Sequence, residues 1–456
     1  MLAMVRKMAS LIALLALLCP ALLFSAGAVS SENPVGDSWA AKAPMQKARI
    51  GLGAAAVNGK IYAIGGLGDI TGIGYSSLAV NEEYDPATDT WTYKTPMPTP
   101  RYAFAIAVYK NKIYCIGGKA GGFSATGVNE VYDPATDTWR TLQPMPTARM
   151  QLQANVVDGK IYLMGGRVSD QSYRNDTVFS LNEAYDPLTN IWTTKASMPQ
   201  AIAVYASAVV NNKIYVINQT LNMIYDAQND SWSQGAPPHI KYIAIGGATT
   251  GILAPQRIYV FSGSKAQNYD PRTNSWTDSA SIPKERYFAG IAVLDDRFYV
   301  IGGWTYEHTK YGPSVNEFQQ VYTGANEVYT PIGYGAAPPE IMILSPENNM
   351  SYNSSSFSLN FTVNKPTNWS CYSLDGEENV SITGNTTIAD LSNGVHNVTV
   401  YANDTLGNSG ASETIAFTIN QPALFPTVEI ATIATIMIAI IVFVAVYLKR
   451  RKPTVV

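Results

Sequence analysis

The chain has 456 residues, of which 46% are hydrophobic and 14% are charged, and its formal net charge is -3. This length allows two or three domains, and the near-neutral charge argues against a nucleic-acid surface, which is usually basic. Histidine occurs only three times, no zinc-type spacing is present, and we assign no metal or cofactor. Cys115 and Cys371 fall in different predicted domains, so we expect no disulfide between them.

Residues 1–28 have the pattern of a secretory signal peptide. Arg6 and Lys7 precede an apolar run over Leu11–Phe24, and the small residues Ala26–Ala28 suit a cleavage site. A basic start followed by a short apolar stretch is typical of export signals. We therefore predict that the rest of the chain leaves the cytoplasm.

One segment recurs along the chain, with Tyr-Asp near its middle and Trp at its end. The clear copies are Asn81–Trp91, Asn129–Trp139 and Asn182–Trp192, and the weaker ones are Ile224–Trp232 and Asn268–Trp276. A repeat of roughly 40 to 53 residues indicates stacked units, none of which buries its apolar faces alone.

The second repeat predicts four antiparallel strands. The apolar run Ala103–Tyr109 is followed by a tight turn and by Lys112–Ile116, which ends in Gly117-Gly118. Continuous apolar runs are expected where both faces of a sheet are covered. A third strand follows at Asn129, an Asp-Pro turn reverses the chain, and a fourth begins at Trp139. Such units closed into a ring form a β-propeller.

The Gly-Gly pair, the Tyr that follows it and the late Trp resemble kelch repeats, and the resemblance covers residues 33–335. The Gly-Gly positions and their substitutes predict six blades; seven would need a hidden repeat. The sixth has a third strand at Asn326 but no following Trp. We expect the segment around Trp39 to supply its outer strand and close the ring. The fold class is thus all-β, a six-bladed kelch-like propeller followed by a sandwich.

Residues 338–420 show a second pattern, in which apolar and polar residues alternate over short strands such as 357–363, 398–402 and 415–419. This alternation predicts a β-sandwich that resembles an Ig-like or fibronectin-like stalk. Glycosylation sequons cluster here and recur in the propeller. The candidate glycosylation sites are Asn175, Asn218, Asn229, Asn349, Asn353, Asn360, Asn368, Asn379, Asn385, Asn397 and Asn403.

Residues 430–448 carry no charge and match the length of a membrane-spanning helix. The basic tail at 449–456 predicts a cytoplasmic C-terminus, with the N-terminal domains outside the cell. The alternative is a buried core helix. The combination of signal, sequon-rich stalk and terminal anchor resembles archaeal cell-surface proteins, so a single-pass cell-membrane location is expected.

Basic residues recur where each innermost strand begins, except in blade four, which has Ile202. With the loops after the Gly-Gly pairs, which carry aromatic residues, they form a candidate ligand-binding surface. Its members are Arg49, Arg101, Arg149, Lys241, Arg286, Arg167, Tyr173, Trp304 and Tyr306. The structural alternative pairs the arginines with third-strand glutamates, namely Glu83, Glu130, Glu183 and Glu327.

These patterns favour a cell-surface recognition protein that binds an extracellular carbohydrate or protein. One alternative is an extracellular carbohydrate-modifying enzyme. An oxidase-like site would need more ligands than His239 and His308, whereas a mutarotase-like site needs only positioned Arg and Glu. A second alternative is a structural envelope component. We assign no catalytic residue.

Overall fold

The computed structural model describes residues 36–69, 74–121, 124–169, 176–239, 246–308, 318–422 and 427–450. Five features predicted from the sequence lie outside these ranges: the signal peptide at 1–28, Tyr173, Asn175, Lys241 and the end of the basic tail at 451–456. They remain predictions.

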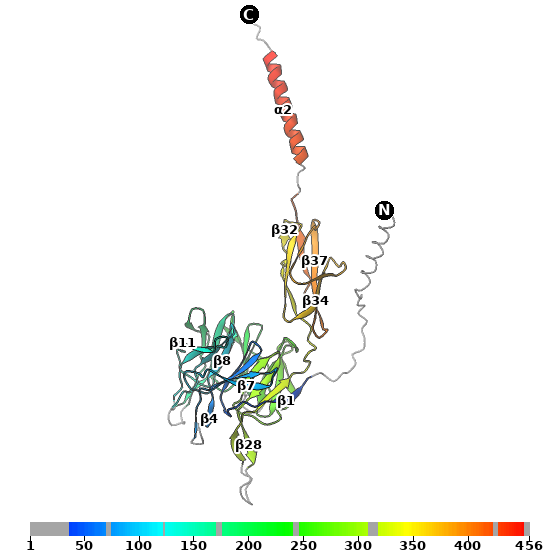
Figure 1. The fold of residues 1–456 in the computed structure, drawn as a ribbon. Coiled ribbons are helices and arrows are strands. Elements are labelled where there is room, and N and C mark those ends of the chain that lie inside the picture. The colour runs from blue at the N-terminus through cyan, green and yellow to red at the C-terminus, as the bar shows by residue number, and fades with distance from the viewer. Residues whose placement is uncertain are drawn as a thin grey trace, which may run out of the picture. The chain divides into compact units, whose positions relative to one another are not determined.

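Six four-stranded antiparallel sheets make up the blades in the described part of the chain (Figure 1). The innermost strands contact one another in cyclic order, and the last of them contacts the first. The innermost strands are β2 (Gly53–Val57), β8 (Ala105–Tyr109), β12 (Gln153–Val157), β18 (Ala206–Val210), β22 (Gly246–Thr249) and β26 (Gly290–Leu294). The six predicted blades are confirmed by this ring of sheets.

The remaining strands of each blade follow in order from the channel outward. The second strands are β3 (Lys60–Ile64), β9 (Lys112–Ile116), β13 (Lys160–Met164), β19 (Lys213–Ile217), β23 (Ile258–Ser262) and β27 (Arg297–Ile301). The third strands are β6 (Asn81–Asp85), β10 (Asn129–Asp133), β16 (Asn182–Asp186), β20 (Asn222–Asp226), β24 (Lys265–Asp270) and β30 (Asn326–Thr330). The outer strands are β7 (Thr90–Lys94), β11 (Thr138–Leu142), β17 (Ile191–Thr194), β21 (Ser231–Gln234), β25 (Ser275–Ser279) and, for blade six, β1 (Ser38–Lys42).

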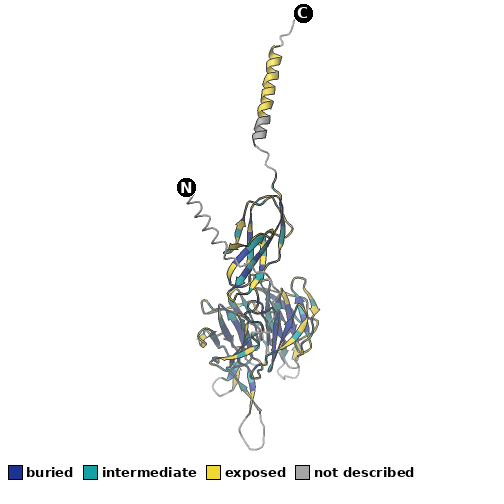
Figure 2. Cartoon of the chain, turned by 90° about the vertical axis from the view of Figure 1, so that its right-hand side faces the viewer, coloured by how far each residue is buried: buried dark blue, intermediate teal, exposed yellow. Residues whose placement is uncertain are grey.

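The second strands are buried almost along their whole length, because neighbouring blades cover both of their faces. In β9, for example, Ile113, Cys115 and Ile116 have no exposed surface. Figure 2 shows buried residues concentrated in the strands of the blades. These covered strands confirm the prediction from the continuous apolar runs in the sequence.

Strand β1 closes the ring, as predicted. It pairs antiparallel with β30, so that Trp39 lies opposite Tyr329. The Trp39 ring also contacts Phe261 of blade five, with centroids 5.7 Å apart. The N-terminal segment thus completes a blade whose other strands come from the far end of the propeller sequence.

Each blade is joined to the preceding one by a set of contacts that we call the rim clasp. In blade two, the Tyr132 hydroxyl donates to Asp137 Oδ1 at 2.6 Å, and Asp137 Oδ1 also accepts from the Thr95 amide at 2.9 Å. Trp139 Nε1 donates to the Thr95 carbonyl at 2.9 Å. The equivalent Tyr, Asp or Asn, and Trp residues of the other clasps are Tyr84, Asp89 and Trp91; Tyr185, Asn190 and Trp192; Tyr225, Asp230 and Trp232; Tyr269, Asn274 and Trp276; and Tyr329, Asp37 and Trp39.

The carboxylate or amide residue of every clasp has a φ between 47° and 59°. Asp and Asn tolerate this left-handed conformation better than other side chains that carry a Cβ. This backbone requirement explains why the repeated segment has Asp or Asn just before its Trp.

The loops after the Gly-Gly pairs of blades one, three and six contain short two-stranded ribbons. These are β4 (Leu67–Asp69) with β5 (Tyr75–Ser77), β14 (Arg167–Ser169) with β15 (Asp176–Val178), and β28 (Trp304–His308) with β29 (Phe318–Tyr322). Backbone pairing in these ribbons satisfies the peptide groups of the extensions.

Residues after the propeller form two sheets that share an apolar core containing Leu359, Val398 and Phe417. One sheet contains β31 (Ile341–Ser345), β33 (Phe357–Val363) and β36 (Thr386–Ile388). The other contains β32 (Ser351–Tyr352), β39 (Ile415–Ile419), β37 (Gly394–Asp404), β34 (Thr367–Leu374), β35 (Val380–Ile382) and β38 (Ser409–Ala411). The strands predicted from alternation are present, and the described sequon asparagines are exposed or half-buried. Glycosylation itself remains a prediction.

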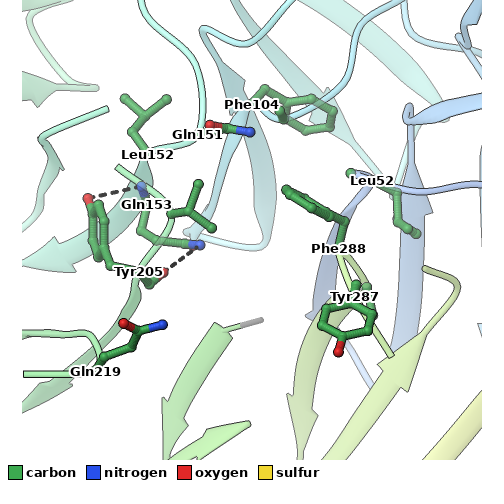
Figure 3. Close-up of a pocket in the computed structure, with 13 residues that line it drawn as sticks. Leu52, Phe104, Gln151, Leu152, Gln153, Tyr205, Gln219, Tyr287 and Phe288 are labelled. Carbon is green, nitrogen blue, oxygen red and sulfur yellow. Dashed lines mark hydrogen bonds between the residues drawn. The ribbon is translucent and has the colours of Figure 1, made fainter. Parts of the chain in front are cut away.

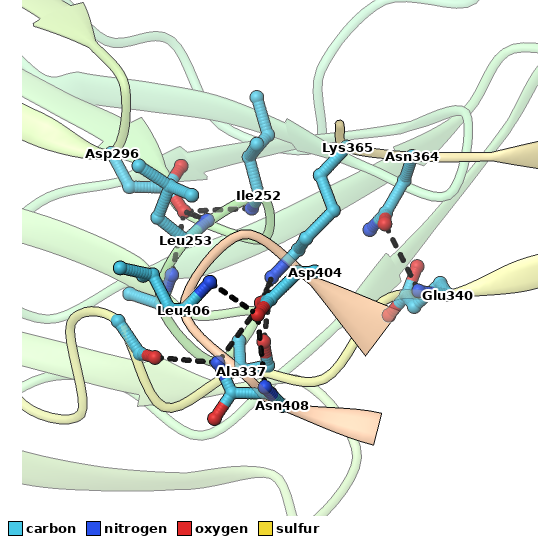
Figure 4. Close-up of polar contacts among 12 residues, drawn as sticks. Ile252, Leu253, Asp296, Ala337, Glu340, Asn364, Lys365, Asp404, Leu406 and Asn408 are labelled. Atoms are coloured by element: carbon cyan, nitrogen blue, oxygen red, sulfur yellow. Dashed lines mark hydrogen bonds and ion pairs between the residues drawn. The ribbon is translucent and has the colours of Figure 1, made fainter. Parts of the chain in front are cut away.

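Polar contacts link this sandwich to the chain segments before it (Figure 4). Lys365 is buried, where its ammonium donates to the Ala337 carbonyl and lies 3.4 Å from the Asp404 carboxylate. Asn408 Nδ2 donates to the Gly335 carbonyl at 2.6 Å. A buried ammonium needs such hydrogen-bond acceptors, because burial of an unpaired charge is unfavourable.

Helix α2 (Thr427–Arg450) covers residues 430–448, where we predicted a membrane span. Within the part of the chain that the structure describes, we find no helix that combines the length and apolar character needed to cross a membrane. The structure therefore does not support the predicted span.

Candidate functional site

Four of the arginines predicted to bind a ligand are instead buried in ion pairs within the blades. Each guanidinium contacts a glutamate of the third strand, and the pairs are Arg49–Glu82, Arg101–Glu130, Arg149–Glu183 and Arg286–Glu327. At most 1% of each arginine is exposed. These contacts are the ones that the structural alternative predicts. We therefore correct the assignment of the four arginines from ligand-binding residues to residues that stabilise the blades.

The second guanidinium nitrogen of three of these arginines is also engaged. Arg101 Nη2 donates to the Cys115 carbonyl at 2.8 Å, and Arg49 and Arg149 make the same bond to their own second strands. Burial lowers the pKa of Arg49, while the charge of Glu82 opposes that shift. The partner in blade one is thus Glu82 and not Glu83, which instead accepts from the Tyr62 hydroxyl.

Blade four lacks both members of this ion pair. Ile202 replaces the arginine and Met223 replaces the glutamate, and both are buried in one apolar cluster. Removing one partner alone would leave a buried charge uncompensated, at a cost of about 3–5 kcal/mol. The paired replacement shows that a blade can form with an apolar contact at this position.

Two positions after each arginine or its substitute, the backbone bends around the mouth of the channel. Gly51, Ala103, Gln151, Val204 and Phe288 all have φ between 53° and 58°. Their backbone amides and carbonyls form a chain of hydrogen bonds that passes through five blades; we call these five residues the mouth ring. The bonds run from Val204 N to Gln151 O at 3.1 Å, Gln151 N to Ala103 O at 2.8 Å, Ala103 N to Gly51 O at 2.8 Å, and Gly51 N to Phe288 O at 2.8 Å.

Glycine adopts this left-handed conformation freely, but the other four residues of the mouth ring do not. For a residue with a Cβ the conformation costs about 1–2 kcal/mol, and Val204 is the most unusual case because its Cβ is branched. Strain of this kind persists where the surrounding structure enforces it, and it is concentrated at functional sites. The mouth ring therefore marks the surface around it as a candidate functional site.

The mouth ring frames a pocket of about 350 Å³ (Figure 3). Its apolar wall is formed mainly by Leu52, Phe104, Leu152, Val204 and Phe288. Three glutamines, Gln151, Gln153 and Gln219, add amide groups. Among the described residues that line the pocket, none carries a formal charge. The pocket thus differs from the basic site predicted from the sequence.

Hydrogen bonds hold one side of the pocket in place. The Tyr205 hydroxyl donates to the Met164 carbonyl and accepts from the Gln153 amide at 3.1 Å. Gln153 Nε2 donates to the Tyr205 carbonyl at 3.3 Å. Burial raises the pKa of Tyr205 above its usual value, so this tyrosine is neutral at physiological pH.

Two aromatic residues predicted for the binding surface lie next to this pocket. Tyr287 lines the pocket and stacks on Trp304, with ring centroids 4.4 Å apart. Tyr306 meets Trp304 edge to face at 4.9 Å. In contrast, Arg167 forms an ion pair with Asp176 across the ribbon of blade three. Trp304 and Tyr306 therefore lie beside the pocket, because Trp304 stacks on Tyr287, which lines it.

Among the described residues that line this pocket, features of catalytic chemistry do not converge. Burial raises the pKa of the Cys115 thiol to about 12, which keeps it protonated and unreactive. In the ranges that the structure describes, no three His, Cys, Asp or Glu residues are grouped so that they could hold a metal ion. The arrangement is suited to binding by shape and apolar contact.

Two family models match the blades: the FKB95 kelch-repeats domain over residues 93–244, and the Kelch motif over residues 48–98. The chain contains kelch repeats. The kelch resemblance inferred from the Gly-Gly, Tyr and Trp positions is thereby confirmed. The matches support the repeats and the β-propeller, and they do not address the sandwich or the chain termini.

Several proteins with kelch repeats are similar to this chain. Kelch-like protein 25 of Xenopus tropicalis is 29% identical over 268 residues, which is 55% of this chain and 36% of that protein. Kelch-like protein terF of Aspergillus terreus is 26% identical over 250 residues, covering 55% of this chain and 38% of the relative. The influenza virus NS1A-binding protein homolog of Mus musculus is 45% identical over 78 residues, covering 17% and 11%. The chain therefore spans less than two fifths of the length of these relatives.

A solved structure titled "Structure of YjhT" is also similar, with 15% sequence identity and a TM-score of 0.47. The match covers 60% of this chain and 95% of that chain.

The mouth ring could not be found by comparing residue types between repeats. The position holds Gly, Ala, Gln, Val and Phe in different blades, so only the repeat register could have located it. Counting two residues past each predicted arginine would have led to the ring.

Proposed function

We propose that this chain is a recognition protein that binds a partner protein at the mouth of its propeller channel. The observation that carries the proposal is the pocket within the mouth ring, where one backbone geometry places a different residue from each of five blades. Kelch-repeat proteins commonly mediate protein–protein binding, and one relative is named as binding a viral protein. A concave, mainly apolar pocket with a few amide groups supports binding.

A carbohydrate partner is the second candidate. The cluster of Tyr287, Trp304 and Tyr306 beside the pocket favours it, because exposed aromatic faces provide large apolar surfaces with polar edges. Tyr306 is 44% exposed. We rank a carbohydrate partner second because the pocket has fewer glutamine amides than apolar groups.

The export signal and the sequons predicted from the sequence support a partner outside the cell. Protease added to intact cells should remove the propeller if this placement holds, and full protection would refute it.

The partner can be identified by photo-crosslinking from the pocket. Gln219 lies in the loop after β19 and lines the pocket, so a photoreactive amino acid at this position should capture the partner. Leu188 is 72% exposed in the turn between the third and fourth strands of blade three. Successive connections between strands alternate between the two faces of the propeller, so this turn lies on the face opposite the pocket. Position 188 is therefore the matched control.

A protein crosslinked from position 219 and not from position 188 would support the proposal. Identical products from both positions, or no product from position 219 in intact cells, would refute binding at the channel mouth.

A further inference from the structure

We infer that His396 is a pH-dependent latch at one end of the sandwich: its charged imidazolium ties two turns together, and its neutral form releases one of them. The latch loosens as the pH rises, at the point where the chain leaves the sandwich. This inference concerns the domain after the propeller and is independent of the partner proposed for the channel mouth.

Both ring nitrogens of His396 face hydrogen-bond acceptors. Nδ1 lies 2.7 Å from Asp375 Oδ2, and Nε2 lies 2.8 Å from the Ser392 carbonyl oxygen. A carboxylate and a carbonyl can only accept, whereas a neutral imidazole carries a single N–H. Both contacts are therefore hydrogen bonds at the same time only when the ring holds two protons and is positively charged.

The surroundings of the ring make the second proton important. His396 is 6% exposed, and its ring packs on Phe417 of the sandwich core, with ring centroids 5.7 Å apart. If the ring were neutral and stayed in place, one nitrogen of this buried side chain would turn a lone pair toward an acceptor oxygen, which is unfavourable. Because the hydrogen bond to a carboxylate is the stronger of the two, the remaining proton stays on Nδ1 and the contact with Ser392 is lost.

The two acceptors come from different turns. Asp375 lies between β34 and β35, and its Oδ1 also accepts from the Asn397 amide at 2.7 Å, so it remains bound to β37 when the ring is neutral. Ser392 lies in the loop between β36 and β37 and is exposed, so water can replace the ring as the donor to its carbonyl. Loss of the second proton therefore releases the Ser392 loop and not the Asp375 turn.

The released loop also holds the end of the sandwich. Asn393 Nδ2 donates to the Gln421 carbonyl at 3.2 Å, and the Gln421 amide donates to Asn393 Oδ1 at 2.7 Å. Gln421 follows β39, which is the strand before helix α2. The Leu391 amide donates to the Ser355 carbonyl at 3.0 Å, and this bond keeps the first part of the loop in place. The release is therefore confined to Ser392, Asn393 and the segment that Asn393 holds.

The charges around the ring favour its protonated form. The turns beside it carry four carboxylates, and the facing strand β39 has no ionisable side chain. The carboxylates are Asp375, Glu377, Glu378 and Asp390, and His396 forms its ion pair with Asp375. Burial lowers the pKa of His396, but the Ser392 carbonyl and the Asp375 carboxylate raise it more, so that the pKa lies above its usual value of 6.5.

The sign of the pH dependence follows from this direction. A histidine whose pKa is higher in the latched state than in the released state stabilises the latch fully below about pH 6.5. That stability is lost as the pH rises through the pKa of the latched state, because release then gives up one proton. Between these two pKa values the equilibrium constant for release rises by about tenfold per pH unit.

Hydrogen exchange on the full chain tests the latch. Exchange at the imidazole C2 position, followed by mass spectrometry, gives the pKa of His396 separately from those of His239 and His308. We expect a value above 6.5. Exchange of the Gln421 amide, corrected for its intrinsic pH dependence, should accelerate by up to about tenfold per pH unit above pH 6.5. The Leu391 amide should not accelerate and is the internal control.

Three variants separate the charge from the structural role of the turn. Asp375→Asn removes the carboxylate but keeps a side chain that tolerates the φ of 52° at this position. It should lower the pKa of His396 and start the release at a lower pH. Glu377→Gln removes a carboxylate from the same turn, keeps the Asp375 contact, and should leave both quantities nearly unchanged. His396→Gln does not titrate in this range and should abolish the pH dependence at Gln421.

A pKa of His396 at or below 6.5, or a pKa that is the same in Asp375→Asn as in the wild type, would overturn the inference. Exchange at Gln421 that follows only its intrinsic pH dependence in the wild-type chain would overturn it too. The wild-type measurements test the latch even where a variant fails to fold. Each outcome is independent of the crosslink from position 219, so the latch and the proposed function can fail separately.

Discussion

The rim clasps and the mouth ring both recur around the propeller, but the clasps recur in their side chains and the ring recurs in its backbone conformation. At the rim, the side chains repeat, since Tyr, Asp or Asn, and Trp make the same hydrogen bonds in all six blades. At the mouth, the backbone repeats while the side chains differ from blade to blade. This difference indicates that the rim stabilises the ring, and it supports our proposal that the mouth distinguishes between partners.

The largest expected effect comes from the buried ion pairs between these two regions. Arg149→Ala leaves Glu183 buried without its partner, and we expect a loss of about 3–5 kcal/mol in the free energy of unfolding. Chemical denaturation measures this loss. Blade four provides the control, because Ile202 and Met223 fill the same positions there.

The double variant Arg149→Ile with Glu183→Met copies blade four and should recover most of the lost stability. A loss below about 1 kcal/mol in Arg149→Ala, the usual scale of an exposed ion pair, would contradict a framework role. The arginine would then return to the candidate binding surface.

A smaller effect is expected at the clasp that closes the ring. Asp37→Ala removes the acceptor for the Tyr329 hydroxyl and for the Ala280 amide, at a cost of about 1–3 kcal/mol for unsatisfied groups. Strand β1 should also exchange its amide hydrogens faster, because it is held by pairing and packing alone. Asp137→Ala removes the equivalent contacts in blade two and should leave exchange in β1 unchanged. Equal exchange of β1 in both variants would contradict this role for Asp37.

The smallest effect concerns acid stability. Hydrogen bonds from the Tyr84 hydroxyl and then from the Ala43 amide hold the pKa of Asp89 below its usual value of 3.8. A carboxyl whose pKa is lower in the folded state adds stability above its usual pKa and loses it as the pH falls below about 4. Asp89→Asn copies the clasp of Asn190 and should make the melting temperature less sensitive to pH between about 5 and 3. An unchanged pH profile would show that this clasp does not contribute.

Most of the propeller could be predicted from the sequence because its elements have local causes. The Asp-Pro turns, the Gly-Gly pairs and the alternation of Phe357–Val363 each follow from backbone conformation or burial. The closing strand was predictable for a different reason, since the last blade lacked a Trp and the segment at Trp39 supplied one. The ribbons were missed because strands as short as β4 have no periodicity to detect.

The candidate site was only partly predictable. The sequence indicated the face on which the pocket lies and placed Trp304 and Tyr306 there, but it could not decide whether an arginine reaches solvent. That outcome depends on whether a glutamate on another strand lies within reach, which is a property of the fold. The mouth ring could not be recognised from residue types in the sequence, because its members share a φ angle and not a residue type.

The closing strand also has a consequence for synthesis. Asp37 and Tyr329 form one clasp although they are 292 residues apart. At about 5–20 residues per second, a ribosome needs roughly 15 to 60 s to produce the second after the first. During that time the edge of β1 has no β30 to pair with, and unpaired strand edges promote association between chains. The interval before the ring closes is thus when a nascent chain is most exposed to pairing with another copy of itself.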